Sequence, residues 1–288
     1  MLNGSPDDAM PGRRRECAVL GAPVVHSLSP VIHRAAYRHL GLDWRYSAHE
    51  VDEETFADFI AGLDEDWRGL SLTMPLKRVA FQVATQTSDL ARRVGAANTL
   101  IRSDDGWFAE NTDVPGFIAA LRERGVPAPE TVCVWGGGAT AASVLAAMGL
   151  FDAGSTHVHA RSAERAQAAL DVAEAFGHSA RHAGWDVTEH CHEAQLIVNT
   201  APGGAVDAYA STLAGAAAPA RVLFDVIYDP WPTPLAAGWS AGGGVVVNGL
   251  DLLVHQALEQ ITLMTGSEVP VKVLRDSAEQ ALATRTAT

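Results

Sequence analysis

The stretch from Thr131 to Phe151 contains no charged residue, and three consecutive glycines interrupt it near its start. It is about long enough to span a bilayer, but the glycines and the many small residues do not suit a continuous apolar span. A buried strand at 131–135, a tight turn at 136–138 and a buried helix at 141–148 explain the stretch better. Because the sequence holds no other candidate span, we expect a soluble, cytoplasmic protein.

A rhythm of strands and helices continues after this stretch. Apolar strand patterns at 157–160, 196–199, 222–225 and 245–247 alternate with helical segments for the most part. This alternation is typical of a doubly wound parallel sheet.

The residues before Asn111 also alternate, and they close with a hairpin around Asp104-Asp105-Gly106. This pattern predicts a mixed sheet with helices on its faces. The expected strands cover 16–21, 44–49 and 70–73, and the hairpin adds strands at 99–101 and 107–110. The expected helices cover 29–40, 52–61 and 76–84, and Ser29 is expected to be the N-cap of the first.

The segment 125–129, rich in Gly and Pro, is a natural linker between the two parts. Helices expected at 250–265 and 272–283 can return to the first part. The sequence therefore predicts an α/β fold with an N-terminal mixed-sheet α/β domain at 13–113, completed by 250–288. A Rossmann-type doubly wound domain is expected at 114–249, and a flexible tail at 1–12.

Charge narrows the classes of ligand. The chain has 21 Lys and Arg against 34 Asp and Glu, a net charge of −13. Nucleic acid and anionic membranes are poor partners for such a chain, so an anionic small molecule would have to be held by local groups. The three cysteines lack paired spacing, which fits a reducing cytosol. The sequence leaves open whether the protein is a monomer or a homodimer.

A glycine pattern follows the strand at 131–135. Gly136, Gly137 and Gly138, then Ala139, Thr140 and Ala141, match G-x-G-x-x-G/A at the opening of a helix. Glycine lets the backbone approach a pyrophosphate closely, and the helix start offers N–H groups to the anion. The sequence therefore favours a dinucleotide site, with a plain tight turn as the alternative.

The end of the next strand indicates which dinucleotide is bound. An NAD enzyme usually places an acid there, but this chain reads Ala160-Arg161-Ser162-Ala163-Glu164-Arg165. A guanidinium attracts a 2′-phosphate, whereas a carboxylate repels it. We therefore expect NADP, the alternative being ordinary arginines at a solvated helix start.

Several polar residues follow strands of the first part. Ser27 and Ser29 could hydrogen-bond one carboxylate, or Ser29 could only cap a helix. Lys77 is expected at a helix start, where the helix dipole disfavours its charge, although a solvated surface lysine is the plainer interpretation. Asp113 could be an N-cap, and Asn98 a turn residue.

Two short histidine patterns could suggest a metal site. They are His157-Val158-His159 and His190-Cys191-His192. Neither has a convincing second pair of ligands in range, so we predict no metal.

Eight ordered segments combine polar residues with their neighbours: His26-Ser27-Leu28-Ser29-Pro30, Thr73-Met74-Pro75-Leu76-Lys77, Gly95-Ala96-Ala97-Asn98-Thr99, Asn111-Thr112-Asp113, the glycine turn, Asn199-Thr200-Ala201-Pro202, Asp225-Val226-Ile227-Tyr228-Asp229-Pro230, and Gly249 through Leu253-Val254-His255-Gln256-Ala257. Taken together, these segments resemble the motifs of the shikimate dehydrogenase family, and the resemblance covers nearly the whole chain.

The resemblance implies an oxidoreductase of the chorismate pathway of aromatic amino acid biosynthesis, which reversibly reduces 3-dehydroshikimate to shikimate with NADP. It implies Lys77 and Asp113 as the catalytic pair. The implied substrate residues are Ser27, Ser29, Thr73, Lys77, Asn98, Asp113, Tyr228 and Gln256. The implied cofactor residues are Gly136, Gly137, Gly138, Ala139, Thr140, Ala160, Arg161, Ser162, Arg165, Thr200, Val226, Gly249 and Asp89.

The sequence departs from the family pattern at two polar positions. Ser71 stands where the family usually has Asn, and we expect it to bond the backbone instead. Ala160 replaces an Asn that contacts the adenosine. Three alternatives stay open: a quinate/shikimate dehydrogenase, an aminoshikimate dehydrogenase, and a non-catalytic NADP-binding sensor.

Overall fold

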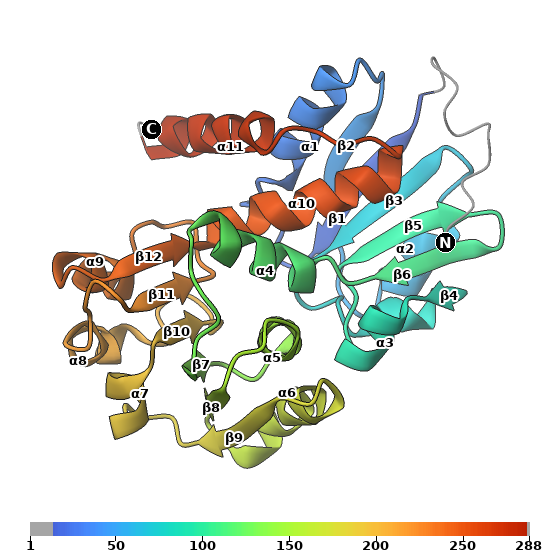
Figure 1. Ribbon diagram of the computed structural model, residues 1–288. Coiled ribbons are helices and arrows are strands. Elements are labelled where there is room, and N and C mark those ends of the chain that lie inside the picture. Colours follow the sequence, from blue (N-terminus) through green and yellow to red (C-terminus); the bar gives the residue numbers. More distant parts are fainter. Residues whose placement is uncertain (1–13, 287–288) are drawn as a thin grey trace. The chain divides into compact units, whose positions relative to one another are not determined.

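The computed structural model describes residues 14–286, so the tail expected at 1–12 lies outside the described residues. The chain divides into two compact units. Unit 1 contains the chain up to Thr112 and the residues from Leu253 onward, and unit 2 contains Asp113–Leu252. Figure 1 shows a separate sheet in each unit. Asp113, expected at the end of the first domain, is grouped with unit 2, where it is the first residue of α4 (Asp113–Glu123).

Unit 1 is built on a mixed sheet with strand order β2-β1-β3-β5-β6-β4. Strands β1, β2 and β3 are parallel, and β5 runs antiparallel to both β3 and β6. The strands are β1 (Glu16–Gly21), β2 (Arg45–Glu50), β3 (Trp67–Leu72), β4 (Gln86–Thr87), β5 (Thr99–Ser103) and β6 (Gly106–Glu110). The helices are α1 (Ser29–His39), α2 (Phe56–Ala61), the 3-10 helix η2 (Val79–Gln82), α3 (Asp89–Val94), most of α10 (Gly249–Thr265), and α11 (Val271–Thr286).

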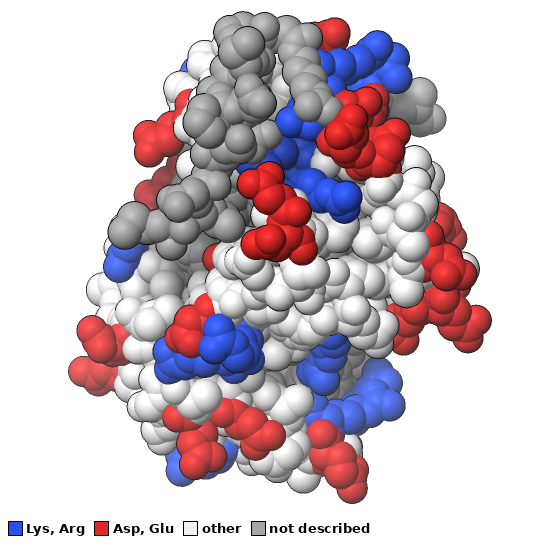
Figure 2. All heavy atoms as spheres, turned by 90° about the vertical axis from the view of Figure 1, so that its right-hand side faces the viewer, with Lys and Arg blue, Asp and Glu red and all other residues white. Residues whose placement is uncertain are grey.

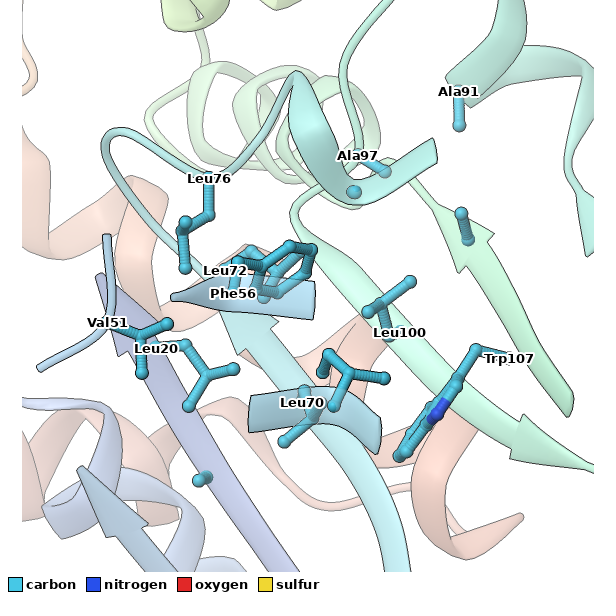
Figure 3. Packing of buried hydrophobic residues seen from close by; sticks show 14 residues of the cluster. Leu20, Val51, Phe56, Leu70, Leu72, Leu76, Ala91, Ala97, Leu100 and Trp107 are labelled. Atoms are coloured by element: carbon cyan, nitrogen blue, oxygen red, sulfur yellow. The ribbon is translucent and has the colours of Figure 1, made fainter. Parts of the chain in front are cut away.

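Alternation along β1 separates two apolar layers in unit 1. Cys17 and Val19 belong to a core that includes Tyr37 of α1 and Met264 of α10. The intervening residues Ala18 and Leu20 belong to the opposite core, because successive strand residues point to opposite faces. Figure 3 shows Leu20, Leu70 and Leu100 of three neighbouring strands in this second layer, with Phe56 and Trp107.

The C-terminal helices pack in unit 1, as the sequence predicts. The Tyr37 hydroxyl of α1 lies 3.6 Å from the Met264 sulfur of α10, and the Ser277 hydroxyl of α11 donates to the Val31 carbonyl at 3.4 Å. This return of the chain confirms the expected fold class for the first part.

Two expected features of unit 1 are wrong. Helix α1 starts at Ser29 with Leu28 as its N-cap, so Ser29 is not the cap; the Ser29 N–H instead donates to the Ser27 hydroxyl at 3.2 Å. The helix expected at 76–84 is a turn followed by η2. In a helix, the Lys77 carbonyl would accept a hydrogen bond from the backbone N–H four residues later. Here it accepts instead from Ala97 N–H at 2.8 Å, in the segment before β5.

Unit 2 is built on a fully parallel sheet with strand order β12-β11-β10-β7-β8-β9. The chain starts in the middle at β7, goes outward through β8 and β9, and then returns to β10 on the other side. This reversal confirms the doubly wound class. The strands are β7 (Thr131–Trp135), β8 (Ser155–His159), β9 (Ser179–Ala183), β10 (Leu196–Asn199), β11 (Val222–Asp225) and β12 (Val245–Asn248).

Helices cover both faces of the unit 2 sheet. On one face, Cys133, Trp135 and Leu223 form a core with Leu213 and Trp239. On the other face, the rings of Phe117 and Phe224 stack at 4.3 Å. The remaining helices of unit 2 are α5 (Ala139–Leu150), α6 (Ala163–Ala175), α7 (Glu189–Glu193), the 3-10 helix η3 (Asp207–Tyr209), α8 (Ala210–Ala214) and α9 (Pro234–Ala241).

Figure 2 shows one face of the molecule, on which acidic and basic side chains are interspersed over uncharged surface. The net charge of −13 is therefore not a continuous acidic layer on this face. Among the described residues, no helix is both long enough and apolar enough to cross a membrane.

Candidate active site

Most of the first-part residues implied by the resemblance lie at one edge of the unit 1 sheet. Ser27 follows β1, Thr73 and Lys77 follow β3, and Thr112 follows β6. Asn98 precedes β5, which runs the other way and therefore starts at the same edge. The topology thus brings together residues that are far apart in the sequence.

Asn98 is the centre of a buried hydrogen-bond network at this edge. Its Oδ1 accepts from Thr112 N–H at 2.8 Å and from the Thr99 hydroxyl at 3.0 Å. Its Nδ2 donates to Thr112 Oγ1 at 2.9 Å and to Gln256 Oε1 at 3.3 Å. These bonds fix the orientation of a side chain that is only 2% exposed. Asn98 is therefore a pre-organised polar group and more than a turn residue.

Gln260 extends this network, and the sequence analysis missed it. Its Nε2 donates to the Asn98 carbonyl at 3.1 Å, and its Oε1 accepts from the Ser71 hydroxyl at 2.7 Å. The Tyr46 hydroxyl donates to Ser71 at 2.6 Å. Ser71 thus bonds side chains, where we expected it to bond the backbone. The spacing of Gln256 and Gln260, four apart on α10, is the signal that could have found the second glutamine.

Lys77 lies in the turn between β3 and η2 and is half-buried. The side chain of Leu76 is fully buried in the unit 1 core and points into it in Figure 3. Burial of Leu76 and the bond from Ala97 N–H to the Lys77 carbonyl hold this turn beside the Asn98 segment. The turn, and not a helix start, is what positions Lys77.

Asp113 is tied to the same network through the chain. It directly follows Thr112, whose backbone and hydroxyl contact Asn98, and it is only 5% exposed. Ser29 is also 5% exposed, and Thr73 is bonded through its N–H to the Leu20 carbonyl at 2.9 Å. The edge therefore offers hydroxyl, amide and ammonium groups, and Asp113 follows Thr112 directly in the chain.

The glycine turn of unit 2 lies at the switch point between β7 and β10. Gly136 has a φ of +119°, a backbone conformation that residues other than glycine rarely adopt. A Cβ on Gly137 would lie 2.2 Å from the Arg165 carbonyl oxygen. Gly138 is the N-cap of α5, and Ala139 and Thr140 form its first turn. The backbone N–H groups of this turn are suited to an anion, so the residues fit a bound pyrophosphate.

The segment after β8 carries the expected arginines. The Ser162 hydroxyl accepts from Arg165 N–H at 3.3 Å and caps α6. The Arg161 guanidinium lies 5.4 Å from the centre of the Trp185 ring, and both arginines are exposed. Together with Ala160, these residues form a positively charged loop at the carboxyl end of β8.

The remaining unit 2 residues also lie at carboxyl ends of strands. Thr200 follows β10 and bonds the Trp135 carbonyl at 2.8 Å, Val226 and Tyr228 follow β11, and Gly249 follows β12. Their loops are shaped by Asn199 and Asp225.

The Asp225 carboxylate accepts from Asn199 Nδ2 at 3.0 Å and from the Thr233 hydroxyl at 2.7 Å. Burial raises the pKa of this carboxyl. Asn199 Oδ1 in turn accepts from Ala201 N–H at 3.1 Å, so the pair ties the ends of β10 and β11 together.

Asp89 lies in unit 1, as the first residue of α3. Its carboxylate pairs with Arg92 at 3.5 Å and its side chain is 73% exposed. An acid in the first turn of a helix is a favourable local arrangement. Its role as a cofactor contact stays a prediction.

A parallel sheet in this strand order, with a glycine turn at its switch point, makes unit 2 a dinucleotide-binding fold of the kind found in nicotinamide-dependent dehydrogenases. Comparison with known proteins identifies the family within this class. Residues 19–100 match the model of the shikimate dehydrogenase substrate binding domain, and residues 249–279 match that of the shikimate 5'-dehydrogenase C-terminal domain. The chain belongs to the shikimate dehydrogenase family.

Full-length relatives support this placement. The chain is 33% identical to a shikimate dehydrogenase (NADP(+)) of Thermosynechococcus vestitus over 95% of this chain and 98% of that protein. The crystal structure of Mycobacterium tuberculosis shikimate dehydrogenase superposes with a TM-score of 0.84 at 37% identity, covering 92% of this chain and 99% of that one. The Thermus thermophilus enzyme, solved with NADP(H) and shikimate, gives 0.82 at 32% identity, with 93% and 99% covered.

Proposed function

We propose that this protein is an NADP-dependent shikimate dehydrogenase that reversibly reduces 3-dehydroshikimate to shikimate. The observation that carries the proposal is the polar edge of unit 1, where the Lys77 turn lies beside the Asn98 network. A ring that carries a carboxylate and several hydroxyls needs several oriented donors and acceptors, and this edge supplies them.

The roles proposed for the residues are those that the family resemblance implies, and the chemistry of each group is consistent with them. Ser27, Ser29 and Tyr228 would bind the substrate carboxylate, and Thr73, Asn98 and Gln256 its hydroxyls. Gly136–Thr140 would hold the pyrophosphate of NADP, and Ala160–Arg165 its adenosine phosphate. Thr200, Val226 and Gly249 would flank the nicotinamide. When bound, NADPH supplies a hydride to the carbonyl carbon of the substrate.

The proton is handled by residues of the chain. As the carbonyl carbon gains hydride, the π electrons move to the oxygen, and the Lys77 ammonium donates a proton to that oxygen. Asp113 stabilises the ammonium before the transfer. One ketone, one NADPH and one proton thus give one alcohol and one NADP⁺. In the other direction, neutral Lys77 accepts the hydroxyl proton.

The cysteines support a cytoplasmic setting for the enzyme. Cys17, Cys133 and Cys191 are all buried free thiols, which suits a reducing compartment. We therefore place the enzyme in the cytoplasm, acting on a small molecule.

An assay with two substrates and two cofactors tests the proposal. Full-length protein is mixed with shikimate or quinate and with NADP⁺ or NAD⁺, and the absorbance of the reduced nicotinamide is followed. Shikimate with NADP⁺ should give the highest kcat/KM. Higher values with quinate or NAD⁺ would instead assign a quinate/shikimate dehydrogenase. NADP⁺ binding without turnover of either substrate would indicate a sensor. The Lys77→Ala variant is the control for contaminating activity.

A further inference from the structure

Unit 2 contains a buried cluster of thiol and imidazole groups that the proposed reaction does not use. Cys133 lies on β7, His159 is the last residue of β8, and Cys191 lies on α7. All three side chains are fully buried. Their donor atoms lie within 4.8 Å of one another, and Cys191 Sγ is 3.2 Å from His159 Nε2. Three separate chain segments thus direct soft donor atoms to one point.

The tautomer of His159 is set by a backbone carbonyl. His159 Nδ1 lies 3.0 Å from the Gly184 carbonyl oxygen, which can only accept, so Nδ1 carries a proton. In the neutral imidazole, Nε2 then presents its lone pair to the sulfur of Cys191. A ring nitrogen bonded to a carbonyl while the other faces soft donors is the usual arrangement of a metal-binding histidine.

Aromatic packing holds the imidazole in this orientation. The Trp135 ring stacks on His159 at 4.7 Å with an interplanar angle of 8°, and Trp185 packs edge-on against Trp135 at 5.1 Å. This stacking and the bond to the Gly184 carbonyl favour the ring orientation in which Nε2 faces Cys191 Sγ. A pre-organised donor set loses less entropy when it binds an ion.

The two thiols are not equivalent. Cys191 Sγ lies 3.2 Å from His159 Nε2 and 3.8 Å from the Thr188 hydroxyl, whereas Cys133 lies on a strand of apolar residues. Cys133 would release its proton when a cation takes the position between the sulfurs.

We propose that Cys133, His159 and Cys191 form a binding site for a thiophilic divalent cation, Zn²⁺. Two thiolates and a neutral imidazole carry a charge that a divalent cation cancels, whereas a monovalent one would leave net charge in the core. With Zn–S near 2.3 Å and Zn–N near 2.0 Å, donors around zinc are spaced by roughly 3.3–4 Å, which these three residues can reach. The Thr188 hydroxyl lies 3.8 Å from Cys191 Sγ, beside the three donors.

This site differs from the prediction of no metal made from the sequence. Only His159 and Cys191 belong to the histidine-rich patterns, while the third ligand lies in an apolar strand. His157 takes part in another contact, since its ring stacks on His190 at 3.9 Å and its Nε2 accepts from Arg181 at 2.6 Å. The fold, and not the local pattern, selects the ligands.

Metal content tests the proposal directly. Full-length protein is purified from cells grown with added Zn²⁺, desalted, and analysed by plasma mass spectrometry. The wild type should retain about one zinc per chain, and Cys191→Ser should lose most of it. Cys17→Ser is the matched control, because Cys17 is a buried free cysteine of unit 1, and it should keep the metal. Equal zinc in the Cys191→Ser and Cys17→Ser proteins would overturn the proposal.

A second measurement needs no variant and therefore does not depend on whether one folds. Wild-type protein produced with Co²⁺ in place of Zn²⁺ should show intense thiolate-to-cobalt charge-transfer absorption, and bound metal should raise the thermal unfolding midpoint. A wild type without this absorption and without zinc overturns the site. So does a Cys133–Cys191 disulfide, detected by peptide mass after alkylation.

Discussion

The two units offer different kinds of binding groups to their ligands. Unit 1 uses side chains: Asn98 and Gln260 are oriented by bonds to other side chains and to backbone from distant elements. Unit 2 uses backbone, because its glycine turn offers N–H groups at the start of α5. Side chains can read the hydroxyls of one particular molecule, whereas N–H groups suit the phosphates of many. We therefore expect most of the groups that recognise the substrate in unit 1, and the groups that hold the pyrophosphate in unit 2.

The largest effect should come from the ammonium of unit 1. Lys77→Ala should lower kcat by roughly 10²–10⁴-fold, as for loss of a general acid/base, with a small change in KM for shikimate. Steady-state kinetics measure both values. Arg78→Ala, at the exposed neighbouring position, is the control and should keep turnover. Wild-type turnover in Lys77→Ala would show that Lys77 of unit 1 is not the general acid/base.

Acid should weaken the folded state through a buried imidazole in each unit. Burial lowers the pKa of His33 from 6.5 to about 4, and burial with His190 and Arg181 lowers that of His157 to about 4. The unfolded chain therefore binds more protons in this window. The free energy of unfolding should fall as the pH drops from 6.5 to about 4, by up to about 3 kcal/mol for His33. His157 should add a smaller loss, because solvent screens it more than it screens His33.

Urea unfolding at several pH values measures this loss. His33→Phe keeps a ring against Tyr46, on which His33 stacks at 4.1 Å, and should reduce the acid sensitivity. His157→Phe should do the same in unit 2. An unchanged pH dependence in both variants would show that neither imidazole is responsible.

The glycine turn of unit 2 should tolerate a methyl group at one position and not at the next. A Cβ on Gly137 would meet the Arg165 carbonyl at 2.2 Å, so Gly137→Ala should reduce the free energy of unfolding by about 1–3 kcal/mol. Among the described residues, a Cβ on Gly138 would meet nothing within 4 Å, so Gly138→Ala is the control. Urea unfolding without nucleotide compares them, and equal stabilities would contradict the close approach.

Cofactor choice should depend on one exposed side chain of unit 2. Arg161→Ala should raise KM for NADP⁺ by roughly tenfold, because a charge-assisted bond to the 2′-phosphate is lost. KM for NAD⁺ should change little, which makes NAD⁺ the internal control. Equal changes in KM for the two cofactors would show that Arg161 does not bind the 2′-phosphate.

Local patterns predicted most of the fold. The strands at Thr131–Trp135, Leu196–Asn199 and Val222–Asp225 have the expected bounds, since buried parallel strands are continuous apolar runs. Strand β9 was missed because Ser-Ala-Arg-His-Ala at the sheet edge lacks any apolar alternation. Helix α3 was missed as well, and its Ser88 cap was the available signal.

Long-range contacts account for what the sequence did not predict at the site. The Lys77 turn exists because its carbonyl bonds Ala97, and Gln260 matters because α10 returns beside Asn98. Local patterns do not show which distant segments meet, although the spacing of Gln256 and Gln260 indicates that both lie on one face of α10. The same holds for Cys133, whose partners lie on β8 and α7.

A double-mutant cycle on Lys77 and Asp113 tests most directly the claim that the ammonium and the carboxylate act as one couple. The values of kcat are measured for Lys77→Ala, for Asp113→Asn and for the double variant. A couple predicts that the double variant is about as slow as the slower single variant. Losses that multiply in the double variant would show that the two residues act independently, and would contradict the account.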